Sequence, residues 1–287
     1  MMWLKWLGWA LGLAVLAALA CAAYGSWRWQ NDTAALRARL EAARVAPSPA
    51  RYNESELQSL PPPVQRYFRA VLKDGQPVVA AANVTLSGTF NMGETTAQWK
   101  SFTSEQRVVA RRPGFDWDAR IKMFPGVPVH IHDAYVAGAG VLRGAALGLI
   151  PVVNMEDSPE LARGELMRFF AEAVWYPTAL LPSQGVRWEA VDDRSARATL
   201  ADDPISLTLT FGFQDDGLIA TVYAEARGRS ITNGKTVSAP WQGRFWNYAE
   251  RNGMHVPLDG EVQWLLAEGA WPYFRATTTR ITYEFAK

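Results

Sequence analysis

Two histidines in one extended segment are the first residues that could do chemistry. His130 and His132 alternate with apolar residues in the segment 127–136, so on a β-strand both imidazoles point to one face and Asp133 to the other. Two imidazoles could begin a metal site, but a zinc site needs a third protein ligand, and His255 is too distant in sequence to be assigned. Two ordinary strand histidines are the alternative. We predict no metal and no cofactor.

Three aspartate pairs could supply two neighbouring carboxylates for acid–base catalysis. Each pair lies in a cluster of turn residues, where Asp caps the backbone, and adjacent side chains on an extended chain point apart. We therefore interpret all three as turns: Asp192-Asp193, Asp202-Asp203-Pro204 and Asp215-Asp216-Gly217.

A glycine-rich stretch resembles the phosphate-binding loop of dinucleotide enzymes. Gly138 and Gly140 follow an expected strand and precede a possible helix, but Arg143 occupies the position of the third glycine, which comes one residue late. We interpret it as a turn beside a packed helix. Because the sequence also lacks a Walker loop, H-E-x-x-H, G-x-S-x-G and a cysteine nucleophile, we assign no catalytic residue.

One helical segment combines charges with large aromatic residues. Glu165 and Arg168 are spaced i,i+3, and Arg168 and Glu172 i,i+4, as in surface ion pairs; Trp175 and Tyr176 follow. These polar groups could stand at the mouth of an apolar cavity and orient a ligand head group. The alternative is a solvated helix face that ends in core aromatics.

The elements that must position these residues are mostly strands. Residues 205–213 alternate strictly between apolar and small polar types, which is typical of a half-buried strand. Similar strands are expected at 78–91, 98–110, 115–123 and 127–136. Hairpin signals separate consecutive strands, as expected for an antiparallel meander: Asn233-Gly234, Asn252-Gly253 and, more weakly, Glu268-Gly269.

Three helices are predicted outside the strands. The first, at 34–44, is a short amphipathic helix capped by the Asn31–Asp32–Thr33 stretch; the second, at 64–72, follows three prolines; the third covers 159–174. The fold class is therefore mainly β, a curved antiparallel sheet or half-open barrel covered by a helix. We divide the chain into a membrane segment (1–30), a helix and linker (31–56) and one β-rich domain (57–287).

The N-terminus predicts a single transmembrane helix. No charged residue occurs between Trp6 and Trp27, and these 22 residues span about 33 Å as a helix, enough to cross the hydrocarbon core. Aromatic residues flank both ends, as membrane interfaces favour: Trp3, Trp6 and Trp9 at one end, Tyr24, Trp27 and Trp29 at the other. A cleaved signal peptide is an alternative, because residues 18–20 read Ala-Leu-Ala.

The only cysteine, Cys21, directly follows Ala-Leu-Ala, so lipidation of this residue is a further possibility. The location predicted is the bacterial inner membrane, with the domain on the periplasmic side. A strict count of positive charges would instead leave the domain cytoplasmic, since Lys5 precedes the span and Arg28, Arg37, Arg39 and Arg44 follow it.

Composition narrows the partners. The formal charge is +1 and no concentrated basic run is present, which argues against a nucleic-acid partner. The chain contains 13 Trp, and large aromatic residues fill a wide core or line an apolar cavity. The partners predicted are therefore the membrane, a lipid or other hydrophobic molecule, and an envelope protein.

Long motifs carry a resemblance. PGFDWDA (113–119), AEAVWYPTALLPS (171–183) and PWQGRF (240–245) are similar to segments of an uncharacterised bacterial family, a domain of unknown function found in membrane-associated proteins. The resemblance covers most of the chain after the linker and implies no activity or catalytic residue. The expected meander with its covering helix is similar in fold to the half-barrels of lipoprotein carriers.

Three functions remain open. The favoured one is a non-catalytic module that binds a lipid or other hydrophobic ligand at the cell envelope. The others are an assembly protein that contacts membrane partners and a hydrolase acting on an envelope component, with a polar cluster near Asp133, Tyr135 and Glu172. The candidate ligand-binding residues are Trp117, Tyr135, Glu172, Trp175, Tyr176, Trp241, Trp246 and Trp264.

Overall fold

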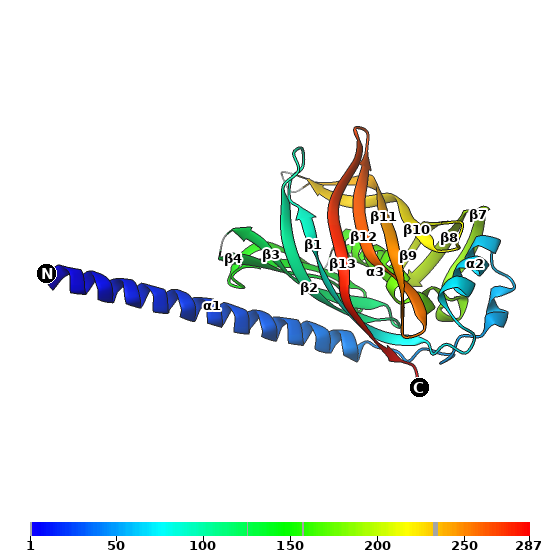
Figure 1. Ribbon diagram of the computed structural model, residues 1–287, viewed down its shortest axis with the longest axis horizontal. Coiled ribbons are helices and arrows are strands. Elements are labelled where there is room, and N and C mark those ends of the chain that lie inside the picture. Colours follow the sequence, from blue (N-terminus) through cyan, green and yellow to red (C-terminus); the bar gives the residue numbers. More distant parts are fainter. Residues whose placement is uncertain (1, 125, 157, 232–234) are drawn as a thin grey trace.

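The protein is a single curved antiparallel sheet with a long helix projecting from it (Figure 1). This computed structural model describes residues 2–124, 126–156, 158–231 and 235–287. The strands are β1 Val79–Asn91, β2 Trp99–Val109, β3 Gly114–Phe124, β4 Val127–Val136, β5 Ala139–Ala146, β6 Ile150–Glu156, β7 Arg187–Asp192, β8 Ser195–Asp202, β9 Ile205–Phe213, β10 Ile219–Ile231, β11 Lys235–Arg251, β12 Met254–Leu266 and β13 Gly269–Phe285. The predicted fold class is confirmed, and β4 and β9 have the predicted bounds.

The chain enters the sheet in its middle. The strand order is β6-β5-β4-β3-β2-β1-β13-β12-β11-β10-β9-β8-β7, so one meander runs outward from β1 to the edge at β6. The second meander begins at the opposite edge, β7, and returns until β13 pairs with β1. Short turns make each meander antiparallel, but the step from β6 to β7 must cross the whole sheet.

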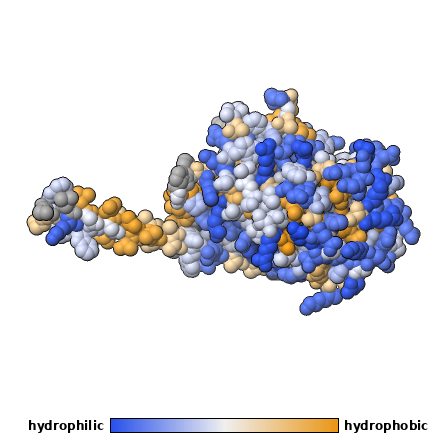
Figure 2. Space-filling view, in the orientation of Figure 1, coloured by the Kyte–Doolittle hydropathy of each residue, from blue (hydrophilic) through white to orange (hydrophobic). Residues whose placement is uncertain are grey.

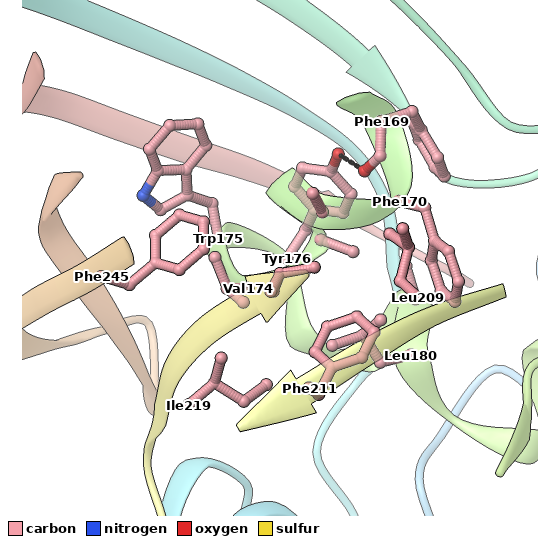
Figure 3. Close-up of a cluster of buried hydrophobic side chains, with 14 of the residues drawn as sticks. Phe169, Phe170, Val174, Trp175, Tyr176, Leu180, Leu209, Phe211, Ile219 and Phe245 are labelled. Atoms are coloured by element: carbon pink, nitrogen blue, oxygen red, sulfur yellow. Dashed lines mark hydrogen bonds between the residues drawn. The ribbon is translucent and has the colours of Figure 1, made fainter. Parts of the chain in front are cut away.

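A helical segment makes that crossing on the concave side. It consists of α3 (Pro159–Glu172) and three 3₁₀ turns, η2 Ala173–Trp175, η3 Pro177–Leu180 and η4 Pro182–Gln184. Ser158 caps α3 by accepting a hydrogen bond from the Leu161 amide at 3.2 Å. Figure 3 shows its aromatic side chains packed with β9, β10 and β11 in the largest buried cluster. Burial of this apolar surface closes the half-barrel at one end.

One glycine lets α3 approach the sheet. A Cβ at Gly140 in β5 would lie 2.6 Å from the Ala162 backbone nitrogen, so any side chain there would push the helix away. The predicted turn beside a packed helix is thus confirmed at residues 137–138, both of which have positive φ. The helix expected after Gly144 is wrong: β5 and β6 follow, because this segment pairs with β4.

The two halves of the sheet also meet through a polar contact. The Tyr135 hydroxyl on β4 donates to Asp202 at 2.7 Å, and the Arg112 Nε donates to the same carboxylate at 3.1 Å. Asp202 ends β8, which is remote from β4 in strand order. The contact therefore depends on the curvature of the sheet, and Asp202 does more than cap a turn.

The N-terminal helix is one continuous element. α1 runs from Met2 to Ala42, so residues 34–42 are helical as predicted, but they continue the N-terminal helix and do not form a separate one. The polar stretch 31–33 lies inside α1, where Thr33 Oγ1 donates to the Trp29 carbonyl at 3.0 Å, one turn earlier. Within the described residues, the segment Lys5–Ala42 contains the one helix window that is long and apolar enough to cross a membrane.

Two short elements connect α1 to the sheet. η1 covers Glu54–Leu57 and α2 covers Pro62–Val71, close to the predicted helix at 64–72. Val64, Tyr67, Phe68 and Val71 are all buried, as their spacing predicted. The hairpin predicted at Asn252-Gly253 connects β11 and β12, whereas Asn233-Gly234 falls outside the described residues.

Candidate ligand-binding cavity

The concave side of the sheet holds a cavity of about 460 Å³. α3 and η2 form one wall, and residues of the central strands form the others. Most of the lining is apolar, and much of it is aromatic. The aromatic lining residues are Phe90, Trp117, Trp175, Trp241, Phe245, Trp264, Trp271, Tyr273 and Phe274.

The aromatic wall is held together by contacts between neighbouring strands. Trp241 on β11 lies opposite Trp264 on β12, and Trp264 stacks on Tyr273 of β13 with ring centroids 5.5 Å apart. The Trp241 indole nitrogen donates to the Tyr273 hydroxyl at 2.8 Å, and Arg227 lies over the Trp241 ring at 4.9 Å. The polar edges of Trp241 and Tyr273 therefore bond to each other, and Arg227, Trp241, Trp264 and Tyr273 all line the cavity.

Two glycines keep the cavity open. Gly243 and Gly260 lie on adjacent strands, and both line the cavity. A Cβ built at Gly243 would meet the Phe245 ring at 3.4 Å and the Trp241 ring at 3.7 Å, both ordinary van der Waals contacts. The backbone conformation does not require glycine here, since neither residue has a positive φ. The missing side chains leave volume that larger residues would fill.

An ion cluster around Arg168 forms one polar part of the wall, and Glu94, Arg227, Arg229 and Glu261 also line the cavity. Arg168 donates from Nη1 to Asp133 at 2.5 Å and from Nε to Glu172 at 2.8 Å. Gln106 contacts both Glu172 and Arg168: its amide nitrogen donates to Glu172 at 2.7 Å and its oxygen accepts from Arg168 Nη2 at 3.3 Å. The guanidinium also lies 4.8 Å from the Trp117 ring centroid. Burial alone lowers the pKa of Arg168, but the attraction of the neighbouring carboxylates raises it overall.

Glu165 lies one turn before Arg168 and is only 5% exposed. Burial raises its pKa well above the usual carboxyl value, and the charge and hydrogen bonding of Asp133 raise it further. Oε2 of Glu165 and Oδ1 of Asp133 have no donor among the described residues. A protonated Glu165 can donate to Asp133, which would satisfy both oxygens.

The surface ion pairs predicted on this helix are only half correct. The Arg168–Glu172 pair exists, but its side chains and that of Glu165 face the cavity and not bulk solvent. The helix lies inside a curved sheet, so its polar face is enclosed as well. The hypothesis of charged groups beside an apolar cavity describes this placement better than a solvated helix face.

Five of the eight candidate ligand-binding residues line the cavity: Trp117, Glu172, Trp175, Trp241 and Trp264. The other three lie elsewhere. Tyr135 contacts Asp202, Tyr176 is buried and donates to the Phe169 carbonyl at 2.8 Å (Figure 3), and Trp246 is 44% exposed on the outer face of β11. Whether the five residues bind a ligand stays a prediction.

Several lining residues were not predicted. Tyr273 and Phe274 lie in a strand whose face could not be assigned without its register. Gln106, which supports the ion cluster from outside the lining, gives no signal in sequence. Asp133 was placed correctly on the face opposite the two histidines, but its pairing with Arg168 joins segments 35 residues apart. The alternation in β4 could show only which face of the strand Asp133 occupies.

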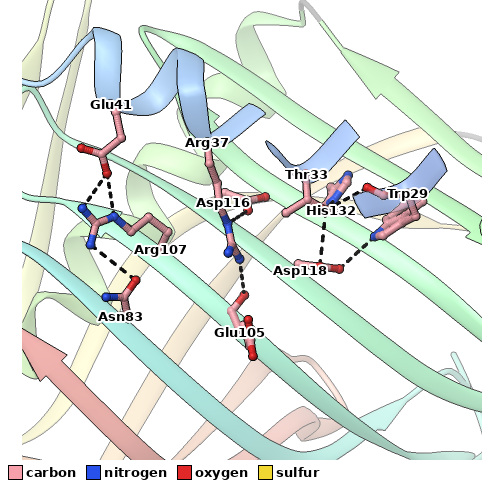
Figure 4. A network of polar contacts seen from close by, with 10 residues as sticks. All are labelled: Trp29, Thr33, Arg37, Glu41, Asn83, Glu105, Arg107, Asp116, Asp118 and His132. Atoms are coloured by element: carbon pink, nitrogen blue, oxygen red, sulfur yellow. Dashed lines mark hydrogen bonds and ion pairs between the residues drawn. The ribbon is translucent and has the colours of Figure 1, made fainter. Parts of the chain in front are cut away.

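Both histidines contact Trp29 of α1 and do not line the cavity; Figure 4 shows His132 beside the helix. Trp29 stacks on His132 with centroids 4.1 Å apart, and Thr33 Oγ1 lies 2.7 Å from His132 Nε2. Among the described residues no group of three metal-type ligands occurs. Burial lowers the pKa of His132 to about 4, against the opposing effect of Asp118. These histidines therefore form part of the sheet surface on which α1 packs.

Further polar pairs fix α1 to the outer face of β2 and β3 (Figure 4). The Trp29 indole donates to Asp118 at 2.9 Å, Arg37 pairs with Asp116 at 2.8 Å, and Glu41 with Arg107 at 2.6 Å. Burial raises the pKa of Asp116 to about 6 although Arg37 opposes the shift. Trp29, predicted in a membrane-interface belt, is instead only 4% exposed against the sheet.

The fold and site together define an open antiparallel half-barrel with a helix across its concave face and an aromatic cavity beneath. The chain belongs to the DUF6920 family, a family of unknown function, whose match covers residues 58–283. The predicted membership of an uncharacterised family is confirmed. No curated protein matches the sequence.

Solved structures similar to this chain include three at low sequence identity, each with a TM-score below 0.5. The first is a LolA superfamily protein from Nitrosomonas europaea, with TM-score 0.40, 9% identity and coverage of 77% of this chain and 92% of that chain. The second is a putative outer membrane lipoprotein-sorting protein domain from Vibrio parahaemolyticus, at 0.37, 8%, 71% and 86%. A β-barrel-like protein of domain of unknown function DUF1849 from Brucella abortus gives 0.21, 9%, 72% and 99%.

Proposed function

We propose that this protein is a membrane-tethered binding module that holds one apolar molecule, such as a lipid acyl chain, in the concave cavity. The observation that carries the proposal is the cavity itself: about 460 Å³, lined mainly by aromatic and aliphatic side chains, with the ion cluster around Arg168 in its wall. Sites for small molecules have volumes of about 300–1,000 Å³ and combine apolar walls with a few placed polar groups.

The positions of the polar groups suggest how a ligand would be oriented. Arg168 already contacts Asp133, Glu172 and Gln106, so its charge is compensated inside the wall. The apolar body of the ligand would lie against Trp241, Trp264 and Phe274 on the opposite side. Its polar end would reach the ion cluster, where carboxyl oxygens accept hydrogen bonds.

An assembly protein has no need for this cavity. Filling the space beside Gly243 and Gly260 with larger side chains would stabilise the sheet through added contacts, and the backbone allows it. An open volume that could be filled at little cost favours binding over a purely structural role.

Photo-crosslinking of the full chain tests the proposal. The protein is placed in nanodiscs made with a phospholipid that carries a diazirine on its acyl chain, irradiated, digested and sequenced by mass spectrometry. We expect adducts on the cavity strands β11–β13 in addition to α1. Adducts confined to α1 would contradict the proposal, because the bilayer contacts that helix in any case.

Two tryptophans of β11 provide a matched pair of variants. Trp241→Ala removes part of the cavity wall, whereas Trp246→Ala removes an exposed ring on the outer face of the same strand. We expect Trp241→Ala to lower the yield of adducts on β12 and β13, and Trp246→Ala to leave it unchanged. Equal yields for the two variants would show that the adducts do not form in the cavity.

The carboxyl pair favours a second candidate, a hydrolase. Glu165 and Asp133 border the cavity, and Glu165 has a raised pKa, as expected of two carboxyl groups that share one proton and act as acid and base. Incubation of the full chain with envelope lipid extracts would reveal cleaved products. Loss of these products in Glu165→Gln would support catalysis; an unchanged extract would leave binding alone.

A further inference from the structure

The contact between α1 and the sheet begins where the apolar stretch of the helix ends. Gly25 packs against the β5–β6 turn, and a Cβ at this position would collide with the Leu147 carbonyl oxygen. Tyr24 and Trp27 are exposed beside it and stack on each other with centroids 5.8 Å apart. If Trp6 to Trp27 cross the bilayer, residue 25 lies at the membrane surface, and so does the turn packed against it.

The strand that follows this turn exposes apolar side chains. β6 is the outermost strand of its meander, and Ile150 and Val152 are 63% and 57% exposed, with Met155 at 37%. The other exposed large apolar residues described outside α1 are scattered along the chain: Val45, Met92, Val191, and Val237 and Trp246 at distant positions of β11. An uncovered apolar edge strand is a site for association, so soluble domains rarely leave one open.

Basic side chains accompany this edge. Arg120 lies opposite His130 in the β3–β4 ladder, and His130 is 5.3 Å from Trp29, so Arg120 belongs to the face that carries α1. Lys122 lies two residues further along the same face, and both residues are exposed. Arg28 is exposed on α1 itself. Basic groups beside apolar ones are typical of surfaces that contact anionic lipid.

We infer that the sheet edge formed by residues 147–155, with Arg28, Arg120 and Lys122, is a second membrane contact whose partner is a bilayer containing anionic phospholipid. The inference depends on the anchor in the proposed function. Figure 2 shows the apolar helix leading directly into this side of the domain. Because α1 is continuous and docked from Trp29 to Glu41, the domain cannot pivot freely about the membrane surface.

This contact also places the cavity relative to the membrane. Ile131 and Leu142 line the cavity from β4 and β5, the two strands that precede the exposed edge. A lipid leaving the bilayer at β6 would therefore have the cavity wall as its nearest apolar surface. The second membrane contact thus assigns the sheet edge at residues 147–155 as the place where the ligand is exchanged with the bilayer.

Depth-dependent quenching in membranes tests the inference on the full chain. Three single-cysteine proteins are labelled with bimane: the native Cys21, and Val152→Cys and Val191→Cys, each combined with Cys21→Ser. Val191 is 45% exposed on β7, the opposite edge of the sheet, and serves as the matched control. Each protein is reconstituted in vesicles of zwitterionic and anionic phospholipid that contain a lipid with a nitroxide on its acyl chain.

We expect strong loss of fluorescence at Cys21, clear loss at residue 152 and none at residue 191. Loss at Cys21 with none at residue 152 would overturn the second contact and leave the anchor intact; the edge would then face water, a second copy or another protein. Equal loss at residues 152 and 191 would also overturn it, as non-specific adsorption. No loss of fluorescence at any position would refute the membrane anchor and, with it, the membrane contact at residues 147–155.

Discussion

Replacing Arg168 by methionine should destabilise the domain more than any other single arginine substitution on α3. The variant keeps an apolar stem of similar length but leaves Asp133 and Glu172 without their cation. Breaking a buried ion pair from one side costs about 3–5 kcal/mol, because the remaining charge is buried and unpaired. Arg168 borders an open cavity and its side chain is 12% exposed, so water can reach the cluster and we expect about 3 kcal/mol.

Urea unfolding at constant detergent concentration measures this loss. Since the urea dependence of the free energy is about 1–3 kcal/mol/M and increases with size, the midpoint should fall by about 1 M for a domain of this length. Arg163→Met is the control, because Arg163 is exposed on the same helix and donates only to the Ser206 carbonyl at 2.9 Å.

The same midpoint for Arg168→Met and Arg163→Met would refute the reasoning. It would mean that the cluster is solvated as well as a surface pair, whose contribution is usually below about 1 kcal/mol. The cavity would then be a water-filled groove and a poor site for an apolar ligand.

Three further predictions follow from the packing. His132 has a folded pKa of about 4 against an ordinary value of 6.5, so between these pH values the unfolded chain binds more protons than the folded protein. The unfolding free energy should therefore fall as the pH drops through this range, and it should fall less steeply in His132→Gln. Parallel pH profiles for the two proteins would contradict the assignment. Gly243→Leu should fill the cavity and abolish lipid crosslinks on β11–β13 without lowering the urea midpoint; undiminished crosslinks would contradict the cavity as the site. Gly140→Ala should lower the unfolding free energy by about 1–3 kcal/mol by displacing α3, whereas Gly164→Ala, in an uncrowded helical position, should raise it by about 0.5–1 kcal/mol. Equal urea midpoints for the two variants would show that α3 does not pack tightly on β5.

Local chemistry was sufficient to predict the elements. The alternation in Ile205–Phe213 and the Asn252-Gly253 hairpin depend on neighbours within a few residues, and both were predicted correctly. The boundary inside α1 was not, because its polar stretch looks like a cap until Thr33 and Trp29 find partners on the sheet. A cap and a docking site use the same residue types, and only the partner distinguishes them.

The cavity depended on contacts that no local pattern records. Three of the five predicted residues that line it, Trp117, Trp241 and Trp264, are aromatic side chains of strands, which had to be buried on one face or the other. Which face was decided by register and by α3, which crosses from β6 to β7 inside the curve. That crossing buries Glu165 and joins Arg168 to Asp133 and Gln106, so a helix face that reads as solvent-exposed becomes a cavity wall.

The sequence by itself determined that this protein has an apolar N-terminal helix followed by an antiparallel β-rich domain, because periodicity and turn residues act over short distances. The tertiary structure decided where the charges and aromatics meet, because curvature brings together residues that are remote along the chain. Hydrophobic burial is non-directional, so it makes aromatic residues gather without specifying the gap they leave. That gap depends on the positions of Gly243, Gly260 and α3 in space.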